Sequence, residues 1–491
     1  MRYVLGIDLG TGSVKAALLD EGGQLAGRSA SEYPLHKPHP NWVEQDAEDW
    51  WRGLCNSVRR ILEGVDPAQI ACVGLSGQLN GAVFVDGNGQ LLRRVPIWLD
   101  HRAQAECDWA QERAADLIRM RALARLQPVH MLAKILWLKA NEPTIYEETR
   151  WALLPKDWLR FRLTGRVVAE VSDASVTAAF DLRERTWSGE ILEAVEIDLE
   201  LFPAVADSPE VVGELTPAAA AETGLEAGTP VVAGGGDVPC MILGSGVIEP
   251  GIVSFGIGTA AHATTFAEQL DPRAFDKLSP MCHPIPGKYA WLGCSLTGGA
   301  SLKWFKEELG GSYDELTAAA AEVAAGAEGL FFMPWLEGSS TPHADANVRG
   351  GFVGLSLRHT RGHMVRAVME GVVYNLRQVL NCFAEIGLPF DELRIGEGGA
   401  DSDLWRQIQA DILGRDVVRI ANGDLSAVGA AMLAGVGSGF YTDFASACRQ
   451  TVKLAETVHC DRARAQLYHR AFARYGALYP VLQGWYAEQN S

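Results

Sequence analysis

The sequence lacks an excess of positive charge. It holds 43 Lys and Arg against 61 Asp and Glu, a formal net charge of −18 over 491 residues. Nucleic acids and anionic membranes are bound through clustered Lys and Arg, so this composition argues against both as partners. It does not argue against a small anionic ligand, because backbone dipoles and a bound cation can meet phosphates locally.

Paired cysteines and long apolar runs are missing as well. The nine cysteines are scattered with no CxxC pair, which predicts reduced thiols and a cytoplasmic protein. No uninterrupted apolar stretch reaches about 18 residues, the length that a membrane-spanning helix needs. Asp8 lies in the middle of the segment that a secretion signal would require. We therefore expect neither secretion nor a membrane span.

The length and the order of apolar segments predict two large domains. A chain of 491 residues is too long for one ordinary core, and no low-complexity linker divides it. Strand-like runs at 3–8, at 14–20 and from residue 24, a helix capped by residues 46–49 and a buried strand at 70–75 form the start of an actin-like, ribonuclease-H-like unit.

The same order is found again after residue 245. A hairpin is predicted at 251–255 and 261–265, a long helix at about 363–385, and a strand at 393–395. The next helix is capped by Asp401 or Ser402 and ended by Gly414. The predicted fold is α/β, with two actin-like domains, 1–244 and 245–491. Each domain is a mixed sheet flanked by helices.

Three glycine-rich turns follow buried strands, although the GxxxxGK[ST] pattern of a P-loop enzyme is absent. They are Asp8 with LGTGS (9–13), SFGIGT (254–259) and AGGGD (233–237). Glycines let backbone N–H groups approach an anion, and a carboxylate can hold hydrated Mg²⁺. If both halves face one cleft, Asp8 and Asp237 meet there. That arrangement suits phosphoryl transfer with Asp237 as the base.

Longer motifs agree with this interpretation, and nearly the whole chain resembles an FGGY-family carbohydrate kinase, most closely the xylulokinases. The segments that carry the resemblance are GIDLGTGSVK (6–15), GLSGQLNG (74–81), IWLDHR (97–102), LPKDWLRFRLTG (154–165), GGGD (234–237), FGIGT (255–259), GGFVGLSLRHTRGHMVRAVME (350–370) and GEGGADSDLWRQIQADILG (396–414). The resemblance implies ATP-dependent phosphorylation of a ketose, most simply D-xylulose, in a cleft between the two domains.

The resemblance also assigns roles to single residues. Asp237 would be the catalytic base, and Asp8 and Asp237 would hold Mg²⁺. The residues implied in ATP binding are Gly10, Thr11, Ser13, Gly256, Gly258, Thr259, Gly298, Gly398, Gly399 and Ala400. Those implied in sugar binding are Gln78, Leu79, Asn80, Trp98, Asp100, Asp237 and Val238.

Asn80 and Val238 depart from the xylulokinase pattern, which has His and Asn at these places. Val238 cannot hydrogen-bond a hydroxyl through its side chain, and such a loss typically costs about 1–3 kcal/mol. A kinase for another ketose or polyol, such as ribulose, therefore remains open. An actin-like or chaperone-like ATP switch also remains open from the fold alone.

Two further segments have competing interpretations. Asp100 and Arg102 could contact the sugar or form a structural ion pair. Lys156 and Asp157 could contact substrate, or cap a helix that starts with Trp158, and we favour the cap. A homodimer is expected from base rates alone.

Overall fold

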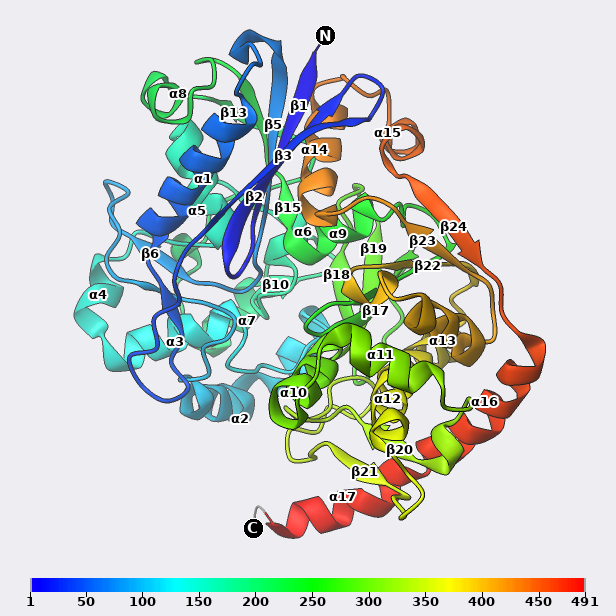
Figure 1. Cartoon of the computed structure of the whole chain (residues 1–491). Helices are drawn as coiled ribbons and strands as arrows, with labels where there is room; N and C mark the ends of the chain where they lie inside the picture. Colours follow the sequence, from blue (N-terminus) through cyan, green and yellow to red (C-terminus); the bar gives the residue numbers. More distant parts are fainter. Residues whose placement is uncertain (1, 490–491) are drawn as a thin grey trace. The chain divides into compact units, whose positions relative to one another are not determined.

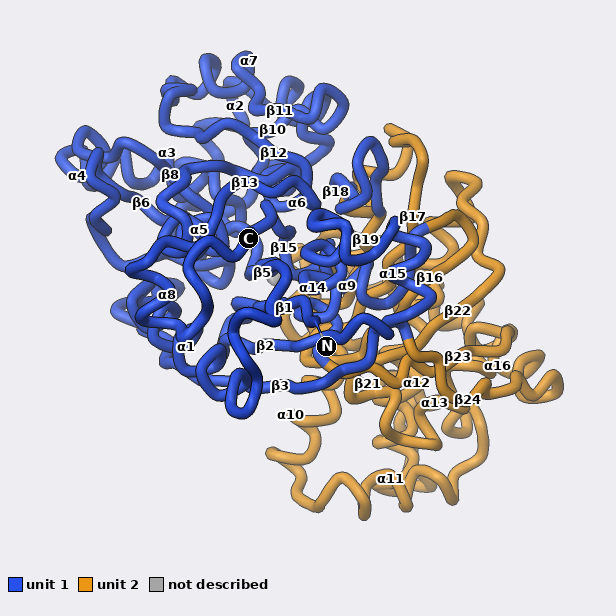
Figure 2. The backbone as a smooth tube through the Cα atoms, turned by 90° about the horizontal axis from the view of Figure 1, so that it is seen from above, with its two compact units in different colours: residues 1–248, 280–290, 424–452 blue, residues 249–279, 291–423, 453–491 orange. Residues whose placement is uncertain are grey.

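The computed structural model describes residues 2–489. The chain forms two compact units, residues 1–248, 280–290 and 424–452 in one and residues 249–279, 291–423 and 453–491 in the other (Figure 2). These ranges differ from the predicted 1–244 and 245–491, because 280–290 and 424–452 pack with the N-terminal part. Within the described residues, no helix has the length and apolar character needed to cross a membrane.

The first unit is built on a seven-stranded mixed sheet (Figure 1). Strands β1 (Tyr3–Leu9), β2 (Ser13–Asp20) and β3 (Leu25–Glu32) form an antiparallel meander, as predicted. Strand β5 (Ile70–Gly77) is parallel to β1. With β13 (Val211–Glu214) and β14 (Pro230–Val232), the order is β13-β14-β5-β1-β2-β3, and β15 (Gly235–Gly236) also pairs with β5. The predicted mixed sheet is confirmed.

Helices cover both faces of this sheet. Helix α1 (Ala47–Ile61) begins at the predicted cap, where Asp46 accepts from the N–H of Glu48. Its buried residues Trp50, Leu54 and Val58 share a core with Leu5 and Ile7 of β1. The alternate residues of the strands face the opposite way, toward helix α14 (Leu425–Gly437), which contacts both β1 and β5.

Glycines let α14 approach the sheet closely. A Cβ on Gly6 would lie 1.9 Å from the carbonyl oxygen of Ala427, and one on Gly74 would lie 2.0 Å from that of Ala430. Helix α9 (Asp237–Gly244) packs equally closely on α14, since a Cβ on Gly429 would lie 1.9 Å from the carbonyl oxygen of Cys240. Backbone therefore packs against backbone across α14.

The predicted helix cap at Lys156 and Asp157 is wrong. Helix α5 (Pro155–Thr164) begins at Pro155, whose fixed φ suits the first helical position, and Leu154 is the cap residue without a side-chain bond. Lys156 and Asp157 therefore lie inside the first turn, where both are buried. Lys156 Nζ is 2.7 Å from Asp157 Oδ1.

The remaining elements of the first unit are short or peripheral to the sheet. They are β4 (Glu44–Gln45), β6 (Val83–Val85), β7 (Val95–Pro96), α2 (Gln104–Arg121), α3 (Met131–Asn141), α4 (Pro143–Glu148), β8 (Trp151–Leu153), β9 (Ala169–Glu170), α6 (Val171–Ala174), β10 (Phe180–Asp181), β11 (Thr186–Trp187), α7 (Gly189–Ala194), β12 (Val205–Ala206), β13 (Val211–Glu214), α8 (Pro217–Thr223), β14 (Pro230–Val232) and α15 (Phe444–Thr451).

A second seven-stranded mixed sheet carries the other unit. Strands β16 (Gly251–Ile257) and β17 (Ala261–Ala267) form the predicted hairpin. Strand β22 (Phe390–Gly396) is parallel to β16, and β23 (Val417–Ile420) is parallel to β22. The sheet also contains β24 (Leu454–Val458), β18 (Ser279–Cys282) and β19 (Tyr289–Ser295), although residues 280–290 of the last two strands and their connection are grouped with the first unit.

The predicted long helix is α12 (Arg361–Glu385), and its expected apolar face, including Val368, Val372 and Val379, is buried. It packs against α11 and α13 (Figure 1). Helix α13 (Asp403–Leu413) is capped by Ser402 and ends at Gly414, as predicted. The other elements of this unit are α10 (Gly299–Leu309), α11 (Tyr313–Ala321), β20 (Phe331–Met333), β21 (Gly351–Val353), α16 (Arg462–Gly476) and α17 (Leu478–Gln489).

The close packing of α14 on β1 gives a stability prediction. Replacing Gly6 by Ala places a methyl group against the Ala427 backbone, so we expect the free energy of unfolding to fall by about 3 kcal/mol. Gly189→Ala is the matched control, because nothing lies within 4 Å of its Cβ position. Urea denaturation of both variants measures the difference, and equal midpoints would contradict the described packing.

Candidate active site

Asp8 lies near the end of β1, beside the end of β5. In the sheet register it is opposite Ser76, and Ser76 Oγ donates to Asp8 Oδ1 at 2.7 Å. Burial raises the pKa of Asp8 above its usual value, although the Ser76 hydrogen bond and the charge of Lys15 oppose this shift. Lys15 Nζ forms an ion pair with Asp424 at 2.8 Å. The strand thus presents a carboxylate that a cation would stabilise.

The turn after β1 is held by backbone and side-chain bonds. The N–H of Gly10 donates to the carbonyl oxygen of Ser13 at 3.0 Å, and the Tyr33 hydroxyl donates to the carbonyl oxygen of Gly10. Thr11 Oγ1 accepts from Trp98 Nε1 at 2.9 Å. The structure therefore brings the predicted residues Thr11 and Trp98 together, and Trp98 remains 39% exposed.

Asp237 is the first residue of α9 and directly follows β15, which pairs with β5 at Ser76 and Gly77. Asp8 and Asp237 thus come from one sheet, on opposite sides of β5, and both belong to the first unit. The two carboxylates therefore come together within one unit, and not, as predicted, because two halves face one cleft. Burial, and then the negative charge of Asp8, raise the pKa of Asp237 to about 7.

The loop after β5 lies against the Asp237 turn. A Cβ on Gly236 would lie 2.3 Å from Leu79 Cδ2, so the two segments touch. Gln78 Nε2 donates to Gln45 Oε1 at 2.7 Å. Among the described residues, nothing donates to the buried Gln78 Oε1. Asn80 has a left-handed φ of 64°, and its Oδ1 accepts from the N–H of Met131 at 3.3 Å.

The predicted sugar residue Val238 adjoins this group, and its backbone N–H donates to Asp237 Oδ1 at 2.8 Å. The carboxylate of Asp100 is instead bound by the protein itself, because protein donors occupy both of its oxygens. Oδ1 accepts from Arg102 Nε at 2.8 Å, and Oδ2 accepts from the N–H of Val43 at 2.7 Å. Asp100 is 1% exposed and fixes the segment around Val43.

The donor set fits a magnesium ion. Mg²⁺ keeps several waters and usually takes one or two protein carboxylates. Asp8 and Asp237 supply two, and the mutual repulsion that raises the pKa of Asp237 is what a divalent cation would relieve. Within residues 2–489, no group of three or more His, Cys, Asp and Glu residues could hold a metal ion, so a fully protein-made cage is not formed.

The second unit gathers most of the other predicted nucleotide residues around the turn after β16. Gly298, the cap residue of α10, donates its N–H to the carbonyl oxygen of Thr259 at 2.9 Å. A Cβ on Gly399 would lie 2.5 Å from Cβ of Ile257. These contacts bring together Gly256, Gly258, Thr259, Gly298, Gly398, Gly399 and Ala400.

Sequence reasoning missed Glu397, which lies in the middle of this group. Its Oε2 is 2.7 Å from the positions that a Cβ would take on Gly256 and on Gly258. Its backbone has φ 61° and ψ −169°, a region that is nearly restricted to glycine. The sequence signal that could have identified Glu397 is its position between two glycines, Gly396 and Gly398.

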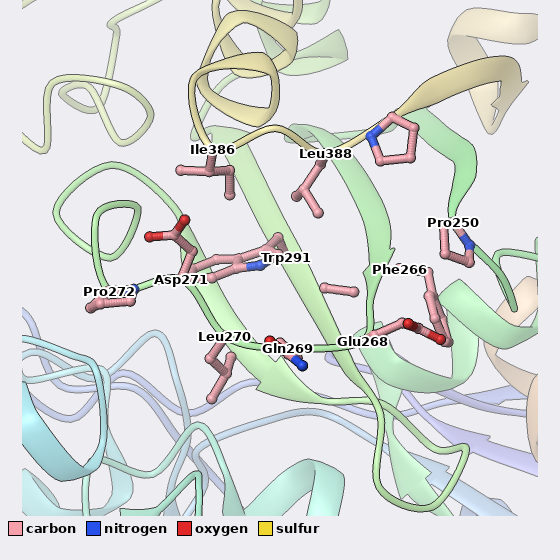
Figure 3. Close-up of a pocket in the computed structure, with 12 residues that line it drawn as sticks. Pro250, Phe266, Glu268, Gln269, Leu270, Asp271, Pro272, Trp291, Ile386 and Leu388 are labelled. Carbon is pink, nitrogen blue, oxygen red and sulfur yellow. The ribbon is translucent and has the colours of Figure 1, made fainter.

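A cavity of about 470 Å³ also lies in the second unit (Figure 3). Its lining combines Trp291 and Leu270 with the carboxylates of Glu268 and Asp271. None of the predicted site residues lines it. The cavity is therefore separate from the residues described above.

Comparisons with known proteins identify the family of the chain. The N-terminal domain model of the FGGY family of carbohydrate kinases matches residues 3–244, and its C-terminal domain model matches residues 281–438. A xylulose kinase of Bacillus subtilis (strain 168) is 33% identical over 483 residues, covering 98% of this chain and 97% of that protein. An L-xylulose/3-keto-L-gulonate kinase of Escherichia coli (strain K12) is 32% identical over 501 residues, covering 99% and 98%.

A crystal structure of a kinase from Brucella ovis, described as a xyloylose kinase, has a TM-score of 0.92 at 30% identity, covering 98% of this chain and 100% of that chain. The two-sheet fold described above is thus shared by a solved relative. The matches cover 97–100% of the length of these relatives and include residues of both units.

Glu397 gives a prediction about backbone strain. Replacing Glu397 by Gly removes a side chain from a conformation that costs a non-glycine residue about 1–3 kcal/mol, so we expect the variant to be more stable. Glu397→Ala removes the same charge but keeps the Cβ, and it should show no such gain. Thermal unfolding of the two variants tests this prediction. Equal melting temperatures would show that relief of backbone strain does not stabilise the glycine variant.

Proposed function

Because the chain belongs to the FGGY family of carbohydrate kinases, we propose that it transfers the γ-phosphoryl group of ATP to a ketose, converting D-xylulose to D-xylulose 5-phosphate. The observation that carries the proposal is the pair of carboxylates Asp8 and Asp237, which lie at the ends of two strands that both pair with β5, next to the Gln78–Asn80 loop. Membership of a carbohydrate kinase family also argues against the alternative function, an actin-like or chaperone-like ATP switch.

In this proposal Asp237 is the general base. Its carboxylate takes the proton from the terminal hydroxyl of the sugar as the hydroxyl oxygen attacks the γ-phosphorus, and ADP leaves with the electron pair of the broken P–O bond. A pKa of about 7 suits this role, because a base is most effective when its pKa lies near the working pH.

Asp8 and Asp237 would hold Mg²⁺ together, Asp8 through water. When bound, the ion would neutralise part of the phosphate charge during transfer. Asp8 is kept in place by its bond to Ser76. We assign the phosphate contacts to Gly10, Thr11 and Ser13 in the first unit, and to Gly256, Gly258, Thr259 and Gly298 in the second. Gly398, Gly399 and Ala400 are assigned to the adenosine.

The sugar contacts in this proposal centre on the loop after β5. The buried Gln78 Oε1 has no donor among the described residues, and a buried acceptor without a partner is costly. A sugar hydroxyl would supply the missing donor. Leu79 and Val238 would form the apolar side of the site, and Trp98, 39% exposed, would pack on the sugar. Asp100 would act through its bond to the Val43 N–H.

A second candidate substrate is supported by a specific observation. Val238 offers no side-chain hydrogen bond beside Asp237, and one relative of similar identity is named an L-xylulose/3-keto-L-gulonate kinase. A kinase for another ketose, including ribulose, or for a polyol is therefore the alternative. The homodimer stays a prediction.

The base assignment predicts the effect of mutation and of pH. Asp237→Asn should lower kcat by about 10³-fold, since general base catalysis contributes about 10²–10⁴. A base must be deprotonated, and bound Mg²⁺ would lower the pKa of Asp237 from about 7, so kcat/KM of the wild type should fall about tenfold per unit below a midpoint that lies under pH 7 and that moves down as Mg²⁺ is added. Asp116→Asn, on the exposed surface of α2, is the matched control. A folded Asp237→Asn enzyme with near-normal sugar-dependent ADP formation would disprove the assignment.

The substrate assignment predicts the outcome of a sugar panel. We expect kcat/KM for D-xylulose to exceed the values for L-xylulose, ribulose, hexuloses and polyols by at least about tenfold, equivalent to about 1.4 kcal/mol. Coupled ADP release measures each ratio. A tenfold preference for another acceptor would replace D-xylulose while leaving the kinase chemistry in place.

A further inference from the structure

We propose that Ser172, oriented by Glu170, is a positioning residue that holds the catalytic base Asp237 in place; this rests on the function proposed above. The N–H of Gly236 donates to Ser172 Oγ at 3.2 Å. Gly236 is the cap residue of α9, where no side chain of the helix supplies a capping bond, and Asp237 is the next residue. Ser172 thus contacts the Gly235–Gly236 peptide group, one residue before the base.

Glu170 fixes the direction of this hydrogen bond. Ser172 Oγ donates its only proton to Glu170 Oε2 at 2.9 Å, which leaves the oxygen lone pairs for the Gly236 N–H. Glu170 accepts three other hydrogen bonds from described groups. Ser208 Oγ donates at 2.5 Å, and the N–H groups of Ser172 and Asp173 donate at 2.7 and 3.2 Å. The carboxylate therefore acts as an acceptor only.

A buried ion cluster supports Glu170 in turn. Lys156 Nζ lies 3.5 Å from Glu170, 3.2 Å from Asp173 and 2.7 Å from Asp157. Arg160 Nη2 lies 3.0 Å from Asp157. All of these side chains are at most 1% exposed. Buried charged groups of this kind are costly unless they are paired, so an arrangement that took Glu170 away from Lys156 would be unfavourable.

The packing around Gly235 and Gly236 leaves little freedom on the other sides. A Cβ on Gly235 would lie 2.8 Å from Cys240 Sγ and 3.3 Å from Ser172 Oγ. Leu79, in the loop after β5, packs against Gly236. With Ser172 Oγ removed, the Gly236 N–H loses this hydrogen bond, and the peptide group can turn its N–H away although β15 stays paired with β5. The Asp237 carboxylate would then move relative to Asp8.

The first experiment compares Ser172→Ala with Ser57→Ala. Ser57 is the matched control, because it is also a buried serine of this unit, and its hydroxyl donates to the carbonyl oxygen of Val14 at 3.1 Å, away from Asp237. We expect Ser172→Ala to lower kcat about tenfold while KM for sugar and for ATP change less than about twofold. Equal kcat in the two variants would overturn the proposal.

A double mutant separates positioning from general loss of structure. If Ser172 acts through Asp237, Ser172→Ala should cost nothing further in the Asp237→Asn background. If the two losses multiply, the proposal is wrong. Ser172→Cys keeps the side-chain volume with a weak hydrogen-bonding group, and it should show the same reduced kcat should Ser172→Ala fail to fold.

Hydrogen exchange tests the bond without any assay of activity. In Ser172→Ala, amide exchange of the peptide that contains Gly236 should become faster, while exchange in α1 should stay unchanged. Unchanged exchange at Gly236 would overturn the inference. If the wild type phosphorylates no sugar but the exchange result holds, the proposed function fails while the contact between Ser172 and the Asp237 turn is upheld.

Discussion

The first unit depends on backbone packed directly against backbone. Helix α14 can lie on β1 and β5 only because Gly6 and Gly74 have no side chains, and α9 can lie on α14 only because Gly429 has none. These contacts hold the strand that carries Asp8 and the helix that begins with Asp237 against one common element. In a close-packed interior, a shift of one element moves the elements packed against it. The packing on α14 therefore sets the distance between the carboxylates of Asp8 and Asp237.

On the other side of the Gly236–Asp237 turn lies a cluster of buried charged side chains. Lys156 and Arg160 lie among three carboxylates with almost no exposure to solvent, and Ser172 joins this cluster to Gly236. Ion pairs of this sort contribute little net stability compared with apolar packing, but breaking one partner is costly. Such a cluster tolerates few alternative arrangements. It therefore suits a part of the molecule where position matters more than stability.

Local signals in the sequence predicted local structure well. The meander from β1 to β3 and the cap at Asp46 follow from alternation and capping chemistry within a few residues. The cap at Lys156 failed because Pro155 starts the helix earlier, and proline at the first helical position outweighed the weak preference for a charged cap. The candidate nucleotide residues were recognisable because glycine runs are conspicuous in a sequence.

Features that depend on distant partners were not predictable. Nothing near residues 424–452 indicates that they pack with the N-terminal unit, because the reason is the absence of side chains at Gly6 and Gly74. Ser172 lies in a helix of four residues, Val171–Ala174, that has no periodic pattern. The conformation of Glu397 is also set by its surroundings. In each case the decisive contact joins residues that are far apart in the chain.

The place of α14 in the chain has a consequence for biosynthesis. A ribosome releases residues 1–248 long before residues 425–437, yet the sheet face that includes Val4 and Cys72 is covered by that later helix. Until then the nascent N-terminal segment exposes an apolar surface, while residues 249–279 and 291–423 emerge. The unit whose synthesis begins first is therefore completed only after most of the second unit has been made, and this interval is when the chain would need protection from aggregation.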